Sequence, residues 1–107
     1  MIDIRIKCNG EPFVLTADGH ANAPRNEDGR DLVCCAVSTL VQTLAASCAQ
    51  IPGVRTTYRK ESGRTKIHLA DTEAHWDELI PRFNMVITGI QVLAEQYPES
   101  VSLTVEE

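Results

Sequence analysis

The sequence predicts an α+β fold in which a largely antiparallel sheet packs with two amphipathic helices. Four runs with strand character occur in two pairs, and each pair is joined by a turn signal, which is the pattern of a β-hairpin. Each hairpin precedes a longer stretch whose apolar residues recur every three or four positions, as on a helix with one buried face. A last alternating run completes the expected order β-β-α-β-β-α-β.

The first hairpin is expected between the N-terminus and Gly19. Residues 2–8 alternate apolar and polar side chains, which is typical of a half-buried strand. Asn9-Gly10 is a turn signal, and residues 12–18 have the composition of the returning strand.

A polar loop and a long helix follow the first hairpin. Residues 22–30 contain Pro, Gly and several polar side chains without periodicity, so we expect a mobile loop there that becomes ordered when a substrate binds. The helix is expected from about Asp31 to Ala49, and Pro52-Gly53 ends it. Its apolar face comprises Val33, Ala36, Val37, Leu40, Val41, Leu44 and Cys48, centred near Leu40 and Leu44.

The second half of the chain repeats the pattern. Residues 54–60 and 64–70 are β-rich runs joined by Glu61-Ser62-Gly63, which predicts a second hairpin. A second helix then follows and ends at Pro98, and Val101–Val105 alternates again as a last strand.

The start of the second helix is marked by two features. Asp71 and Thr72 are candidate caps, and Pro81 either kinks the helix or is the first residue of its main segment. The apolar residues with helical spacing beyond this point are Phe83, Val86, Ile87, Ile90, Leu93, Ala94 and Tyr97.

Length and charge narrow the class of protein. The 107 residues fit one domain, residues 1–107. Neither a membrane span of about 20 apolar residues nor a signal-peptide layout is present, so we expect a cytoplasmic protein without membrane contact. The net charge of −5 argues against direct nucleic-acid binding, and an acidic surface instead attracts a basic partner.

The four cysteines show no metal or disulfide spacing. In a protein without an export signal, Cys8, Cys34, Cys35 and Cys48 are expected as reduced thiols, most of them buried small hydrophobes. A metal site from Cys34, Cys35 and His20 is disfavoured because adjacent helical cysteines diverge. We therefore expect neither a metal nor a cofactor.

Cys34 is the cysteine whose position favours reactivity. If Asp31 caps the helix, Cys34 lies in the first turn, where the positive end of the helix dipole favours a thiolate. Cys35 is rotated by about 100° and should point elsewhere, whereas Cys34 and Ser38 share a face. Cys48 falls within the apolar stripe, and Cys8 is expected as a strand-end hydrophobe.

A cysteine nucleophile needs a base that accepts its proton near neutral pH, and histidine suits this role. His20 is the nearest histidine in sequence and stands at the mouth of the polar loop. His68 lies in a predicted strand and His75 on the predicted second helix, and both are expected to be ordinary polar residues.

These residues also carry a resemblance to a known family. Gly19-His20-Ala21, a short polar loop and Gly29-x-Asp31-Leu32-Val33-Cys34-x-Ala36-Val37-Ser38 resemble the signature of the bacterial ribosomal-processing cysteine proteases, the Prp family. The similarity extends over essentially the whole chain. Cys35 stands where the family usually has Ala, and the polar loop is a couple of residues longer than usual.

The resemblance implies a function and roles for individual residues. His20 and Cys34 would form a catalytic dyad, with Asp31 and Ser38 in support. Gly19, Ala21 and Gly29 would belong to the substrate loop. The family's members are homodimers that remove a short N-terminal extension from a large-subunit ribosomal protein precursor, cleaving after aromatic residues.

An alternative is a non-enzymatic, ribosome-associated binding module. Residues 55–66 hold five of the ten Lys and Arg residues. We interpret this run as a solvated hairpin face, because the overall acidity opposes phosphate binding. A binding module has no need of a reactive thiol, so selective alkylation of Cys34 would separate the two hypotheses.

Overall fold

The computed structural model of the chain describes residues 1–8, 13–19 and 32–106. The described elements follow the predicted order and confirm an α+β fold. They are β1 (Ile2–Lys7), β2 (Phe13–Asp18), α1 (Leu32–Cys48), β3 (Arg55–Glu61), β4 (Arg64–Ala70), the 3-10 turn η1 (Glu73–His75), α2 (Trp76–Gln96) and β5 (Val101–Glu106).

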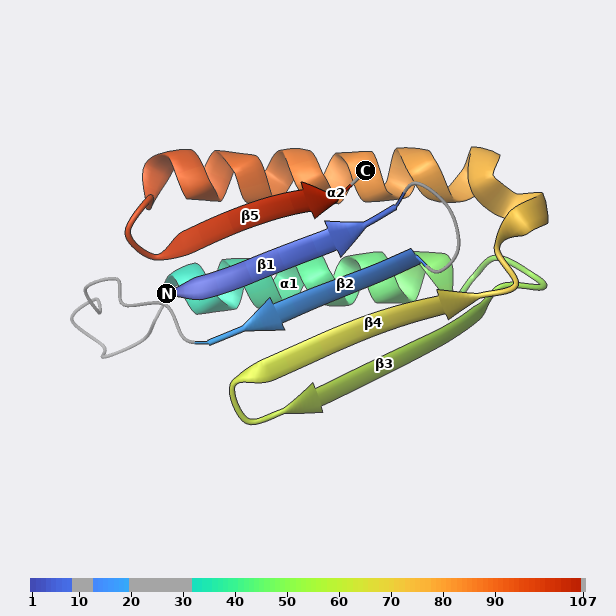
Figure 1. The fold of residues 1–107 in the computed structure, drawn as a ribbon, viewed down its shortest axis with the longest axis horizontal. Coiled ribbons are helices and arrows are strands. Elements are labelled where there is room, and N and C mark those ends of the chain that lie inside the picture. The colour runs from blue at the N-terminus through green and yellow to red at the C-terminus, as the bar shows by residue number, and fades with distance from the viewer. Residues whose placement is uncertain (9–12, 20–31, 107) are drawn as a thin grey trace.

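The strands form one sheet in the order β3-β4-β2-β1-β5 (Figure 1). The pairs β1–β2, β2–β4 and β3–β4 are antiparallel, and only β1–β5 is parallel. The sheet is therefore largely antiparallel, as predicted. Its two edges are β3 and β5.

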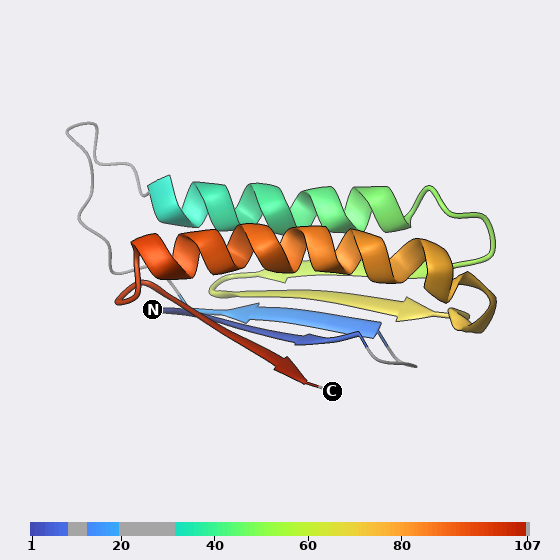
Figure 2. The same cartoon turned by 90° about the horizontal axis from the view of Figure 1, so that it is seen from above.

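Both helices cover the same face of the sheet and lie side by side with opposite directions (Figure 2). No helix among the described residues covers the other face. This arrangement requires each strand to present apolar side chains to one face only, and the alternation of β1 meets the requirement. Ile2, Ile4 and Ile6 are buried, whereas Arg5 is exposed.

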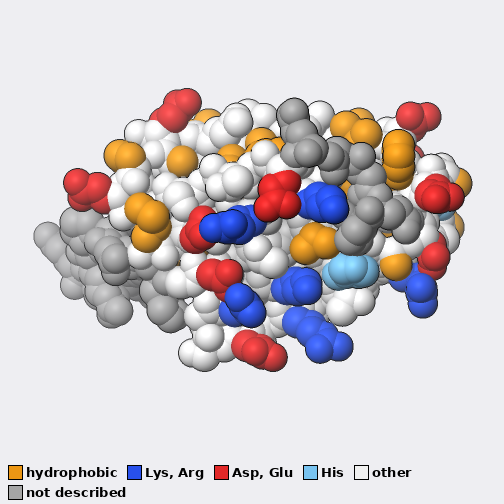
Figure 3. Space-filling model, in the orientation of Figure 1, with side chains coloured by type: hydrophobic (Ala, Val, Ile, Leu, Met, Phe, Trp, Pro, Cys, Tyr) orange, Lys and Arg blue, Asp and Glu red, His pale blue; other side chains and the backbone are white. Residues whose placement is uncertain are grey.

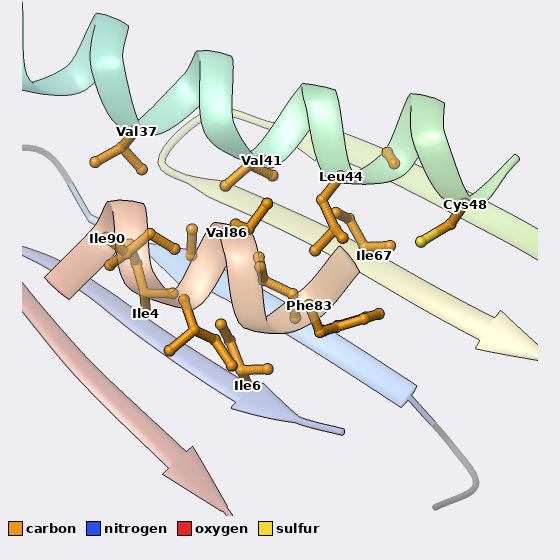
Figure 4. Packing of buried hydrophobic residues seen from close by; sticks show 14 of the residues in the cluster. Ile4, Ile6, Val37, Val41, Leu44, Cys48, Ile67, Phe83, Val86 and Ile90 are labelled. Carbon is orange, nitrogen blue, oxygen red and sulfur yellow. The ribbon is translucent and has the colours of Figure 1, made fainter. Parts of the chain in front are cut away.

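The core lies between the sheet and the helix layer (Figure 4). Phe13 of β2 and Phe83 of α2 are both fully buried, and their rings meet at a centroid distance of 5.4 Å with planes tilted by 57°. The buried residues of α1 are Val33, Val37, Val41, Leu44, Ala45 and Cys48.

The buried face of α1 is therefore rotated slightly from the predicted centre near Leu40 and Leu44. Leu40 is only partly buried, because it lies at the seam between the two helices. Its Cδ2 atom is 3.1 Å from the position that a Cβ on Gly89 of α2 would occupy. The small residue at Gly89 lets the helices approach each other at this point.

The start of the second helical segment differs from the prediction. Thr72 precedes the 3-10 turn η1, which contains His75, and the α-helix begins only at Trp76. Pro81 is not the first residue of the helix but lies inside α2, which continues through it. Leu79 and Phe83 on either side are fully buried, and this burial outweighs the hydrogen bond that proline removes.

Candidate active site

Cys34 lies in the first turn of α1 and is half-buried, whereas its neighbour Cys35 is exposed. Cys48 is fully buried at the other end of the same helix, and Cys8 packs against the core just after β1. The structure confirms the predicted helical phase of these cysteines. Of the three cysteines on α1, Cys34 is the one placed between the core and the surface.

A cavity of about 270 Å³ opens beside Cys34. One wall is α1, and the other is formed by β3 together with the ends of β1, β2 and the β3–β4 turn. The residues that define the two walls are Cys34, Val37, Ser38 and Val41 on α1 and Tyr58 and Lys60 on β3. The cavity combines an apolar floor with a thiol, a hydroxyl and an ammonium group, a mixture typical of small ligand sites.

The floor of the cavity depends on a close backbone contact at Gly19. The Gly19 N–H donates to the Gly63 carbonyl at 2.8 Å, which joins the end of β2 to the β3–β4 turn. Gly19 has φ of 97°, and a Cβ at this position would lie 2.3 Å from the Met1 carbonyl oxygen. Only glycine combines this φ with so close an approach of two backbone segments.

An ion pair reinforces the same corner. Arg64 Nε donates to Asp18 Oδ1 at 2.6 Å across the β2–β4 pair. The hydrogen bond and the charge of Arg64 lower the pKa of Asp18. Because both side chains are largely exposed, we assign this ion pair a role in alignment and little stability.

Ser38 lies one turn after Cys34 and lines the same cavity. Its Oγ accepts a hydrogen bond from Gln42 Nε2 at 2.8 Å. This bond occupies a lone pair and leaves the hydroxyl proton of Ser38 available for a second partner.

Three of the seven candidate site residues therefore lie around one cavity. These are Gly19, Cys34 and Ser38. The other four, His20, Ala21, Gly29 and Asp31, lie outside the described residues, as does the predicted loop 22–30.

The other two histidines lie away from this cavity. His68 is on the face of the sheet that no helix covers, and His75 is in η1, where its Nδ1 is 3.1 Å from Glu78 Oε2. Neither lines the cavity beside Cys34.

Tyr58 and Lys60 were not identified from the sequence as site residues. They reach the cavity because β3 is an edge strand whose helix-facing side is only partly covered by α1, and Tyr58 remains 38% exposed. The available signal was the alternation of β3, which places Tyr58 and Lys60 on one face. This face reaches Cys34 only because β3 pairs with β4 and β4 pairs with β2, and these pairings join segments that are far apart in sequence.

Two further properties concern the described part of the chain. Within residues 1–8, 13–19 and 32–106, no group of three His, Cys, Asp or Glu side chains is arranged to bind a metal ion. Neither α1 nor α2 is long and apolar enough to cross a lipid bilayer.

Gly19→Ala is expected to destabilise the protein by about 1–3 kcal/mol and to lower the activity of the folded protein, because the added Cβ strains φ and pushes on the Met1 carbonyl. Gly53→Ala is the matched control, since Gly53 also has a positive φ of 92° but its Cβ would meet only the His75 ring, at 3.0 Å. Thermal unfolding and peptide cleavage below Tm separate the two variants. Unchanged stability and activity in Gly19→Ala would contradict the role of this contact.

The fold and the cavity define a class of protein: a small α+β domain with a partly buried thiol in the first turn of a helix, beside a cavity. Residues 1–102 match the family model described as cysteine protease Prp, and the chain belongs to this family of cysteine proteases. Comparison with curated protein sequences gives no match.

Solved structures with the same fold extend over nearly the whole chain. The essential ribosomal processing protease Prp of S. aureus, in complex with a covalently linked product peptide, has a TM-score of 0.80 at 24% identity, covering 99% of this chain and 100% of that chain. The same protease with a substrate peptide gives 0.75 at 22% identity, with the same coverage. A protein from Streptococcus mutans gives 0.75 at 25% identity, covering 98% of this chain and 96% of that one.

Proposed function

We propose that this cysteine protease removes a short N-terminal extension from a large-subunit ribosomal protein precursor, with Cys34 as nucleophile and His20 as general base. The observation that carries the proposal is the place of Cys34, half-buried in the first turn of α1 and open to the cavity. The S. aureus structures support the substrate class, because they are of a ribosomal processing protease with bound substrate and product peptides.

The proposed reaction has two steps. Cys34 Sγ attacks the carbonyl carbon of the scissile peptide bond while His20 accepts the thiol proton. His20 then protonates the leaving amine, and water hydrolyses the resulting thioester. The positive end of the α1 dipole and the backbone N–H groups of its first turn favour both the thiolate and the developing oxyanion.

The cavity supplies a binding place for one substrate side chain. Val37 and Val41 are buried in its α1 wall, and Tyr58 forms part of the wall on β3. A volume of about 270 Å³ accepts an apolar or aromatic side chain but not a folded segment. This agrees with the cleavage after aromatic residues that the family resemblance implies. Ser38 and Asp31 are proposed as supporting residues, and Gly19, Ala21 and Gly29 as part of the substrate loop.

The proposal includes a single protease domain over residues 1–107 that acts as a homodimer in the cytoplasm, where ribosomal proteins are made. The outer face of the helix layer supports the dimer. α1 contains no charged residue, and Leu32, Met85 and Val92 on this layer are 60%, 77% and 48% exposed. Light scattering of the purified protein is expected to give the mass of two chains, and a monomer at micromolar concentration would contradict this part.

The function is tested by incubating the protein with the precursor ribosomal protein of the same organism. We expect mass spectrometry to show a shortened precursor with one new N-terminus, and no cleavage of the already mature form. A precursor that binds but stays intact would instead favour the non-enzymatic, ribosome-associated module. If this protein leaves the precursor intact while trypsin removes the extension under the same conditions, the extension is accessible. That outcome would contradict the proposed substrate.

A further inference from the structure

The strand registers place the outward side chains of the bare sheet face in rows across the strands. One row joins Glu61, Arg64, Asp18 and Asp3, in which acids outnumber the one base. The next row joins Arg59, Lys66, Thr16 and Arg5, in which three cations occur without an acid. Figure 3 shows this face, with Lys and Arg side chains next to a His side chain over β3 and β4.

Most arginines on this face are neutralised by an acid. Arg5 pairs with Asp3 at 3.3 Å, Arg55 with Asp71 at 2.6 Å and Arg64 with Asp18 at 2.6 Å.

Arg59 is the exception among the arginines of this face, and Lys66 lies opposite it. Neither side chain forms an ion pair with a residue that the structure describes. The two cations are directly opposite each other in the β3–β4 register. Like charges opposite each other destabilise a sheet. In a protein of net charge −5, this uncompensated cationic pair calls for an anionic partner.

A second cavity lies at this pair. It measures about 290 Å³ and is lined by Thr57, Arg59, Lys66 and His68. Thr57 and His68 are themselves opposite each other in the register, so the four side chains form two adjacent cross-strand pairs on one face. They offer a guanidinium fork, an ammonium group, a hydroxyl and an imidazole, a donor set that matches the oxygens of a phosphate group.

We propose that Thr57, Arg59, Lys66 and His68 bind a phosphate group on the outer face of the sheet. The acids of the neighbouring row, Glu61 and Asp18, and the overall negative charge limit the site to one or two phosphates. A small phosphorylated molecule and the backbone of an RNA strand share this chemistry. On the basic hairpin, the pair Arg59 and Lys66 therefore binds a ligand, while Arg55 and Arg64 form solvated ion pairs.

This site is separate from the cavity beside Cys34. Successive residues of β3 point to opposite faces, so Lys60 lines the cysteine cavity while Arg59 lines the outer cavity. The two cavities share no lining residue. A test of the phosphate site therefore does not depend on the proposed protease substrate.

The test is a titration of the ¹⁵N-labelled protein with inorganic phosphate, with sodium chloride at matched ionic strength as the reference. We expect chemical-shift changes centred on Thr57, Arg59, Lys66 and His68. Arg59→Gln and Lys66→Gln are each expected to raise the Kd about tenfold. Lys60→Gln is the matched control, because it removes the same charge from the same strand on the opposite face and should leave the Kd unchanged.

A second arm titrates a short single-stranded RNA. Tighter binding than phosphate at the same four residues, with a salt dependence of one or two phosphate contacts, identifies a nucleic-acid backbone as the source. Binding of phosphate but not of RNA identifies a small phosphorylated ligand. The proposal is overturned if neither probe shifts these residues, or if Lys60→Gln weakens binding as much as Arg59→Gln does.

Discussion

Cys34→Ala is expected to lower kcat/KM for peptide cleavage by more than about 10³-fold, whereas Cys35→Ala retains most of the activity. The two residues are adjacent in sequence but not in environment. Cys34 is half-buried and lines the cavity, and Cys35 is exposed outside it. Cleavage of a fluorogenic peptide derived from the precursor extension measures both variants.

Alkylation provides a readout of the thiols that does not depend on the substrate. Burial raises the pKa of Cys48 to about 11, so this thiol stays protonated and enclosed at neutral pH and should not react in the folded protein. Mass mapping after brief treatment with iodoacetamide is expected to show Cys34 modified faster than the exposed Cys35, and Cys48 intact. Equal loss of cleavage in Cys34→Ala and Cys35→Ala would show that the nucleophile has been assigned to the wrong residue.

The elements of this fold could be predicted because their signals are local. Alternation in β1 and the three-and-four spacing around Val37 and Val41 depend only on neighbours in sequence. The strand order and the parallel β1–β5 pair were not predicted, because they depend on which distant segments cover each other. Pro81 was expected either to kink a helix or to begin its main segment, and it lies inside α2 between the buried Leu79 and Phe83.

The candidate site also contains some residues that could be predicted from the sequence and others that could not. Helix phase alone placed Cys34 between the core and the surface and put Ser38 beside it, and the structure confirms both positions. Tyr58 and Lys60 became site residues only through the pairing of β3 with β4 and of β4 with β2. The roles of His20 and Asp31 rest on the sequence motif and remain predictions.

The overall composition did not predict a ligand site at the pair Arg59 and Lys66. The net charge of −5 argues against a phosphate ligand when charge is averaged over the whole chain. In the folded protein acids neutralise Arg5, Arg55 and Arg64, whereas Arg59 and Lys66 form no ion pair with a residue that the structure describes. Local charge balance is a property of the folded sheet, so only the pairing of strands reveals it.

His20→Ala is expected to lower kcat/KM about 10²- to 10⁴-fold, the range in which a positioned general acid–base contributes. The base removes the proton of Cys34 and later protonates the leaving amine, so its loss affects both steps. His75→Ala is the control, because His75 lies in η1 beside Glu78 and away from the cysteine cavity. This control should retain the activity of the unmodified protein.

The ionisation of Cys34 distinguishes the two tasks of His20. The helix dipole and a protonated His20 favour the thiolate, and a carboxylate at Asp31 opposes it. Attraction between charges grows when a bound substrate excludes water, so a substrate analogue that leaves the sulfur uncovered should raise the alkylation rate of Cys34. His20→Ala should remove most of that rise. If Cys34 in the unliganded His20→Ala variant is already fully reactive at neutral pH, the helix alone activates the thiol and His20 acts only as the later acid.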